Sequence, residues 1–254
     1  MQIFKAVLTC GALLLASVPA SAQWPNKPMA GLPRTPDGKP NLAAPAPKTA
    51  DGKPDFSGLW QAANGKYLGN LAADSGPAPA LPWAEAFFKK VQASDGAGRP
   101  QERCLPHGIT DYDALPMPIK IVQTPGNIVI LYEAYNHFRQ VFMDGRALPK
   151  DAQPTWMGYS VGKWEGDTLV VDSNGFNDQT WLDDGGHPHT EALRVTERFR
   201  RPDFGHIDLQ LVVEDPKAYT KPWGATLRLN LHPQDELIEN ICENEKDFVH
   251  IVGR

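Results

Sequence analysis

Short runs of alternating apolar and polar residues fill the second half of the chain, and this pattern limits the fold more than any other feature. Ile207, Leu209 and Leu211 alternate with Asp208 and Gln210. Residues 226–231 repeat the pattern, with leucine at every second position. A period of two residues is typical of a strand that buries one face and exposes the other.

Tight-turn sequences separate these runs. Pro125-Gly126 suits a type II turn, and residues 165–167, Glu-Gly-Asp, predict a hairpin. The predicted strands begin at residues 56–60 and continue at 119–124, 127–135, 137–143, 156–164, 168–173, 192–201, 207–214, 223–232 and 236–242. About ten short strands with few helices between them indicate an all-β fold, an antiparallel barrel or a two-sheet clam.

One short helix is predicted near residues 82–93. Pro82 suits a first helical position, and Trp83, Phe87 and Val91 recur every four residues. We expect this stripe to pack against the core.

The first 22 residues have the layout of a secretory signal peptide. Lys5 provides a basic start, residues 6–18 are apolar, and residues 20–22, Ala-Ser-Ala, form a small-residue cleavage site. The apolar run is shorter than a membrane-spanning helix needs. The sequence therefore predicts a periplasmic or secreted protein.

A proline-rich extension follows at residues 23–55, with eight prolines. It contains a short repeat, because residues 35–42 (TPDGKPNL) resemble residues 49–56 (TADGKPDF). We expect an extended segment that lies along the surface or stays mobile, before a single β domain over residues 56–254.

Two cysteines, Cys104 and Cys242, remain after removal of the signal peptide. An even pair in an oxidising compartment favours a disulfide bond. Two separate buried thiols, or a metal site shared with histidines, are the alternatives.

The charge of the chain argues against polyanionic partners. Loss of Lys5 with the signal lowers the formal net charge from −5 to −6. We therefore expect a small-molecule ligand or substrate, no nucleic acid, and no membrane after signal cleavage. The oligomeric state is left open.

Two histidines and three carboxylates gather within residues 183–191, DDGGHPHTE. In an extended segment His187 and His189 would project to the same side. One hypothesis is acid–base catalysis by these histidines, with Asp184 fixing a tautomer. A second is a transition-metal site formed by His187 and His189 with a ligand from elsewhere; no other cofactor is expected. A polar surface loop is the third interpretation.

Glu197 lies on the apolar face of its predicted strand, with Val195 and Phe199. A carboxylate there must find partners or shift its pKa upward. It is either an interior acid or base, or the partner of an arginine from a neighbouring strand.

Tyr132, His137 and Arg139 alternate along a predicted hairpin and could form a polar wall that positions a substrate. Trp181 precedes the histidine loop by six residues and is a further candidate for substrate binding.

The motifs of serine hydrolases, kinases, nicotinamide enzymes and zinc proteases are missing from the sequence. The favoured hypothesis is an exported β-barrel enzyme that uses acid–base chemistry for an elimination, an isomerisation or a hydrolysis.

Two resemblances add to this. Residues 58–60, Gly-Leu-Trp, resemble the Gly-x-Trp opening of lipocalin-like barrels, which implies a non-catalytic carrier of a hydrophobic ligand as the alternative. Residues 158–172, GYSVGKWEGDTLVVD, with residues 103–106 and 242–245, resemble segments of an exported bacterial family of unassigned function. That resemblance implies no activity.

Overall fold

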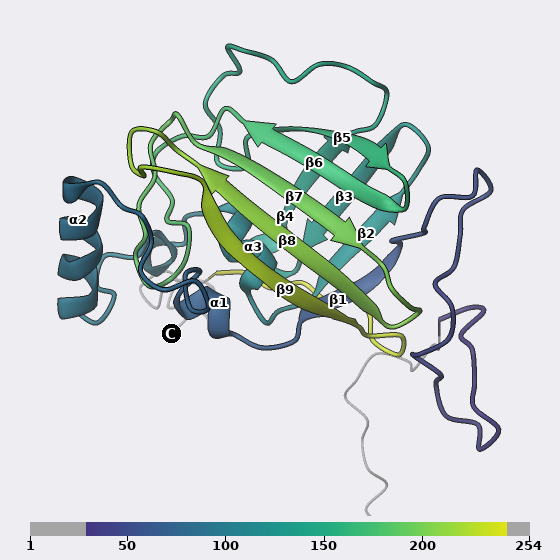
Figure 1. Ribbon diagram of the computed structural model, residues 1–254. Helices are drawn as coiled ribbons and strands as arrows, with labels where there is room; N and C mark the ends of the chain where they lie inside the picture. Colours follow the sequence, from purple (N-terminus) through teal and green to yellow (C-terminus); the bar gives the residue numbers. More distant parts are fainter. Residues whose placement is uncertain (1–28, 243–254) are drawn as a thin grey trace, which may run out of the picture.

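The computed structural model describes residues 29–242, in which nine strands close into a single barrel (Figure 1). The predicted signal peptide lies outside these residues. The strands are β1 Gly58–Ala62, β2 Ile119–Gln123, β3 Asn127–Tyr132, β4 His137–Phe142, β5 Tyr159–Glu165, β6 Thr168–Asn174, β7 Arg194–Arg200, β8 His206–Glu214 and β9 Trp223–Leu231. The predicted all-β barrel is confirmed.

Each strand pairs with its neighbour in sequence, and β1 pairs with β9 to close the barrel. All these pairs are antiparallel except β4 and β5, which run parallel over two residue pairs. Residues 143–158 between them form a long connection rather than a hairpin, so the chain can return and start β5 in the same direction as β4.

The barrel interior is filled by the alternating residues that the sequence singled out. Ile207, Leu209 and Leu211 of β8 are at most 1% exposed. Leu209 lies opposite Leu227 of β9 in the register. Complete burial of each such side chain stabilises the fold by about 1.5–3 kcal/mol.

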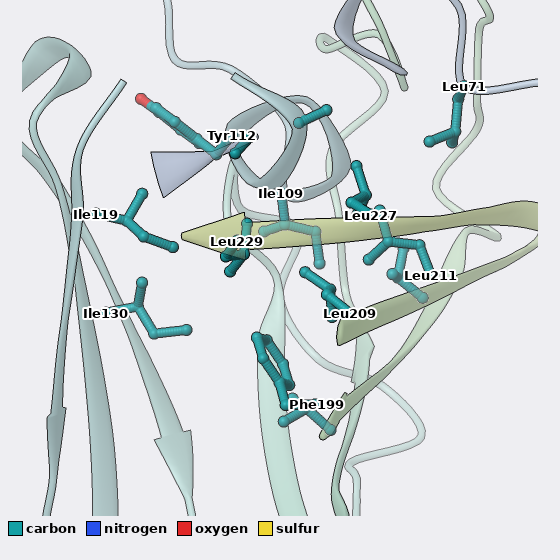
Figure 2. Close-up of a cluster of buried hydrophobic side chains, with 14 of the residues drawn as sticks. Leu71, Ile109, Tyr112, Ile119, Ile130, Phe199, Leu209, Leu211, Leu227 and Leu229 are labelled. Atoms are coloured by element: carbon teal, nitrogen blue, oxygen red, sulfur yellow. The ribbon is translucent and has the colours of Figure 1, made fainter. Parts of the chain in front are cut away.

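Helix α3 (Ile109–Ala114) is buried along its whole length and was not predicted. Its Ile109 and Tyr112 belong to the same apolar cluster as Ile119, Ile130 and the leucines of β8 and β9 (Figure 2). The helix has only six residues, two of them aspartates, so its sequence is too short to show a helical repeat of apolar residues.

Helix α2 (Pro82–Ala93) confirms the predicted helix and its bounds. Val91 and Ala84 are buried, but Trp83 is 44% exposed and its indole N–H donates to the carbonyl of Lys217. The expected core role is therefore wrong for Trp83. Helix α1 (Lys66–Gly69) was not predicted. Within the described residues, no helix is long and apolar enough to cross a membrane.

The two copies of the repeat form the same turn. Thr35 and Thr49 each donate a backbone N–H to the carbonyl four residues on, at 2.9 and 2.8 Å. Gly38 and Gly52 take the matching left-handed conformation, with φ of +84° and +79°. The extension contacts the barrel at the turn between β7 and β8, since Phe204 donates a backbone N–H to the carbonyl of Ala44.

The disulfide between Cys104 and Cys242 is formed, with 5.5 Å between the Cα atoms. The predicted strand over residues 236–242 is wrong. Closure of the barrel pairs both sides of β1, so a tenth strand has no free edge to join. The segment is held instead by the disulfide and by a hydrogen bond from the Ile238 N–H to Glu133.

Candidate proton-transfer site

The histidine loop folds back on itself beside α1 and α2. Leu182 donates its N–H to the carbonyl of His187 at 2.9 Å, which closes the turn. A Cβ on Gly185 would lie 2.4 Å from the carbonyl oxygen of Gly69, and one on Gly186 would lie 2.5 Å from Val91. The two glycines are therefore required because the loop approaches both helices too closely for a side chain.

Asp183 fixes the imidazole of His187. Its Oδ2 lies 2.6 Å from His187 Nδ1 and accepts the N–H of Leu71 at 2.6 Å, while Oδ1 accepts the N–H of His187 at 3.1 Å. Because these contacts bring N–H donors to a carboxylate, Nδ1 of His187 carries the proton. Nε2 has no hydrogen-bond partner between residues 29 and 242.

His187 lies in an aromatic slot. The ring of Phe88 stacks on it at a centroid distance of 4.1 Å, and the ring of Trp223 lies 5.1 Å away. Trp223 and Leu71 also line a cavity of about 390 Å³ beside β8 and β9. The histidine–aspartate pair thus shares two of its contacts with the wall of a cavity large enough for a small molecule.

The structure differs from the sequence prediction in the role of Asp184. Its side chain faces away from His187 and lies 3.4 Å from Nη1 of Arg99. Asp183, and not the expected Asp184, is the residue that orients the histidine.

His189 has both ring nitrogens engaged. Nε2 lies 2.7 Å from the hydroxyl of Thr180, and Nδ1 lies 3.2 Å from the carbonyl oxygen of Thr190. Burial lowers its pKa, so the ring is held neutral. Its nearest aromatic ring is that of Phe176, at 6.5 Å, and it shares no contact with His187. The two histidines thus contact different residues, and the expected cavity that both would face is not found in the described part of the molecule.

A second histidine–aspartate pair lies near the loop and was missed. Nδ1 of His107 is 2.6 Å from Oδ2 of Asp111. His107 precedes α3, and Asp111 lies within it. Asp184 joins this pair, and one ligand atom from each of the three lies within 4.8 Å of the others. Asp184 and Arg99 line an adjoining cavity of about 330 Å³. Burial raises the pKa of Asp111 to about 6 and also raises that of Asp184.

A shared spacing could have revealed both pairs. His107 and Asp111 are four residues apart, and so are Asp183 and His187. Neither pair lies within one helix, because residues 183–187 form a turn and His107 precedes α3, so the spacing indicates only that a tight turn can bring the two side chains together. His187 and His189 are not part of the group with metal-ligand spacing found among the described residues.

Glu197 is separate from the histidine loop and pairs with Arg139 inside the barrel. Nη1 of Arg139 donates to Oε1 at 2.8 Å, Nη2 donates to Oε2, and the hydroxyls of Ser160 and Ser173 complete the guanidinium's contacts. Both charged side chains are at most 1% exposed. The structure thus favours the interpretation that Glu197 has an arginine partner, although Arg139 comes from across the barrel.

Asp113 of α3 faces the same interior cluster. Its carboxyl group lies beside that of Glu197, and the hydroxyl of Tyr132 has no hydrogen-bond partner within the described part of the chain. Burial, reinforced by the charge of Glu197, raises the pKa of Asp113 well above its usual range. Asp113 is therefore a neutral acid beside an ion pair.

The remaining predicted residues are placed as follows. Tyr132 and Arg139 face inward, as expected for a polar wall, but they serve the interior cluster. His137 is half-buried, lies edge-on to Tyr112 at 6.1 Å, and has its pKa lowered by burial. Trp181 is 9% exposed and packs edge-on against Phe87 of α2 at 5.8 Å.

No protein-family model matches the chain, and no curated protein sequence matches it significantly.

Proposed function

We propose that this protein is an enzyme that transfers protons through His187, with Asp183 as the residue that positions it. The observation that carries this proposal is the 2.6 Å contact between Asp183 Oδ2 and His187 Nδ1, with no partner for Nε2 among residues 29–242. A histidine fixed in this way can accept a proton at Nε2, and the carboxylate then stabilises the imidazolium.

The aromatic slot supports this chemistry. Phe88 stacks on the His187 ring, Trp223 lies beside it, and the residue is 3% exposed, so the contact with Asp183 lies in a poorly solvated environment that strengthens it. General acid–base catalysis by a positioned histidine contributes about 10²–10⁴-fold to a rate.

The substrate is a small neutral or anionic molecule that occupies the cavity of about 390 Å³ next to Trp223. Tyr67, Gln210 and Thr226 line this cavity and supply hydrogen-bonding groups. An elimination, an isomerisation or a hydrolysis each needs one positioned proton-transfer group of this kind.

The enzyme acts outside the cytoplasm, in a periplasm or in the medium. The leader-like pattern of residues 1–22 supports export, and the disulfide between Cys104 and Cys242 fits an oxidising compartment. Membership of the exported bacterial family that residues 158–172 resemble is part of the same proposal.

A lipocalin-like carrier is the second candidate, because the chain closes into a single barrel. The carrier hypothesis expects an apolar lumen. The interior is instead filled by buried apolar side chains packed around the ion pair of Arg139 and Glu197. The geometry therefore supports the enzyme better.

The test is a panel of small esters, lactones and hydroxy acids in D₂O, followed by proton NMR. We expect the wild type to convert at least one compound, and His187→Gln to convert it at a rate reduced by at least about 100-fold. His206→Gln is the matched control, because His206 lies 2.7 Å from Asp203 at the other end of β8. Equal rates for His187→Gln and the wild type would overturn the proposal. Conversion of no compound by the wild type would favour the carrier.

A further inference from the structure

Three side chains around α3 bring polar atoms to the corners of a small triangle. Nδ1 of His107 and Oδ2 of Asp111 are 2.6 Å apart. Nε2 of Gln101 lies 2.7 Å from that Oδ2 and 3.0 Å from that Nδ1. Edges of this length are close to those of an octahedron around a divalent cation with bonds of about 2.1 Å.

The hydrogen bonds inside this triangle are incomplete. If Nδ1 of His107 donates to Asp111, the Nε2 group of Gln101 faces a second donor. The side-chain oxygen of Gln101 is buried and has no hydrogen-bond partner in the part of the chain that the structure describes. A side-chain amide can be turned to exchange its oxygen and nitrogen. With the amide turned, an oxygen ligand occupies the third corner.

Asp111 supplies an independent indication. It is fully buried, and its Oδ1 has no hydrogen-bond partner among the described residues. Burying a carboxylate oxygen without a partner costs free energy, and a bound cation would remove this cost. A cation bound within the cluster would satisfy Asp111.

Asp184 completes the cluster from the histidine loop. Its ligand atom lies within 4.8 Å of those of His107 and Asp111. The ion pair of Asp184 with Arg99 is long, at 3.4 Å. Asp184 also lines the cavity of about 330 Å³, which leaves coordination positions open to water or to a ligand.

The disulfide holds the segment that carries two of these residues. Cys104 lies between Gln101 and His107, and its bond to Cys242 ties this segment to the C-terminal part of the chain. The hydroxyl of Tyr135 donates to the carbonyl of Gln101 at 3.4 Å. The cluster is thus fixed by covalent and tertiary contacts before any ion binds.

We propose that His107, Asp111 and Asp184, assisted by the side-chain oxygen of Gln101, bind one divalent first-row transition-metal ion. One imidazole with carboxylate and amide oxygens suits Zn²⁺ or Mn²⁺, whereas Mg²⁺ and Ca²⁺ favour oxygen ligands alone. The proposal is independent of proton transfer by His187.

Isothermal titration of the untagged, chelator-treated protein with ZnCl₂ and with MnCl₂ tests this. We expect one equivalent of at least one ion to bind, and an affinity at least about tenfold lower for His107→Ala and for Asp184→Asn. His206→Ala is the control, since His206 and Asp203 have a similar spacing, 2.7 Å, but are not part of a three-residue group. His187→Gln should bind the ion as the wild type does.

Asp184→Asn shows whether a lower affinity is due to a lost ligand or to misfolding. Asp184 is partly exposed and the change is nearly isosteric, so this variant should fold normally. Its circular dichroism and melting temperature should match those of the wild type. Absence of stoichiometric binding by the wild-type protein would overturn the proposal. So would unchanged affinity in both His107→Ala and Asp184→Asn.

Discussion

Asp183 and Asp184 are adjacent in the chain but serve different histidines. Asp183 turns toward His187 and accepts its Nδ1–H, whereas Asp184 turns toward His107 and Arg99. One short loop can therefore support a proton-transfer pair on one side and a cation site on the other. At the residue scale, the direction of a single side chain decides which chemistry it serves.

His189 should make stability depend on pH. Burial holds its pKa below the ordinary value of 6.5, so the unfolded chain binds a proton there before the folded chain does. Stability contributed by this residue is present above about pH 6.5 and falls as the pH drops, by up to about 1.4 kcal/mol per unit. Denaturant titrations at pH 7 and pH 5 should show a smaller loss for His189→Gln than for the wild type. Identical losses would contradict this.

Glu197 should be costly to remove alone. Glu197→Gln leaves the guanidinium of Arg139 buried without a countercharge, and we expect a loss of about 3–5 kcal/mol in the free energy of unfolding. The double variant Arg139→Met with Glu197→Leu should recover most of this loss, because it removes both charges. Chemical denaturation measures both. A single variant as stable as the wild type would show that the pair is not desolvated.

Much of the candidate site could be predicted as a location but not as a set of contacts. The density of polar residues in 183–191 pointed to the loop that holds the contact between Asp183 and His187, because few other segments combine histidines and carboxylates. The partners Phe88, Trp223 and Leu71 are far away in the chain, so no local pattern could reveal them. Pairing depends on the fold, which periodicity describes only within each element.

At the scale of elements, the strands and α2 followed from period and turn chemistry, whereas α3 did not. Strand alternation is preserved because each strand exposes one face to the interior. Helix α3 is buried on every side and buries two aspartates with its apolar residues, so its six residues show no amphipathic period to detect. The wrongly predicted strand at 236–242 has a strand-like composition but no partner edge.

The disulfide should contribute strongly to stability, because Cys104 and Cys242 are separated by 138 residues. Closing a loop of this size in the unfolded chain stabilises the fold by about 4–5 kcal/mol in the chain-entropy model. The double variant Cys104→Ser with Cys242→Ser should lower the free energy of unfolding by a comparable amount in urea titrations. An unchanged midpoint and slope would refute the estimate.

At the scale of the whole molecule, two regions of the barrel differ in character: its lumen and one of its ends. The lumen holds apolar side chains around the ion pair of Arg139 and Glu197. The end of the barrel near Trp223 carries the histidine loop, covered by α1 and α2. The chemistry we propose belongs to that end, and the lumen serves stability.

The measurement that tests this account most directly is kcat/KM for His187→Gln, Asp183→Asn and the double variant on a substrate found in the panel. Since Asp183 acts through His187, we predict that the double variant is slower than His187→Gln by no more than about threefold. Two results would contradict the account: a loss of kcat/KM in the double variant equal to the product of the two single losses, or full activity of His187→Gln.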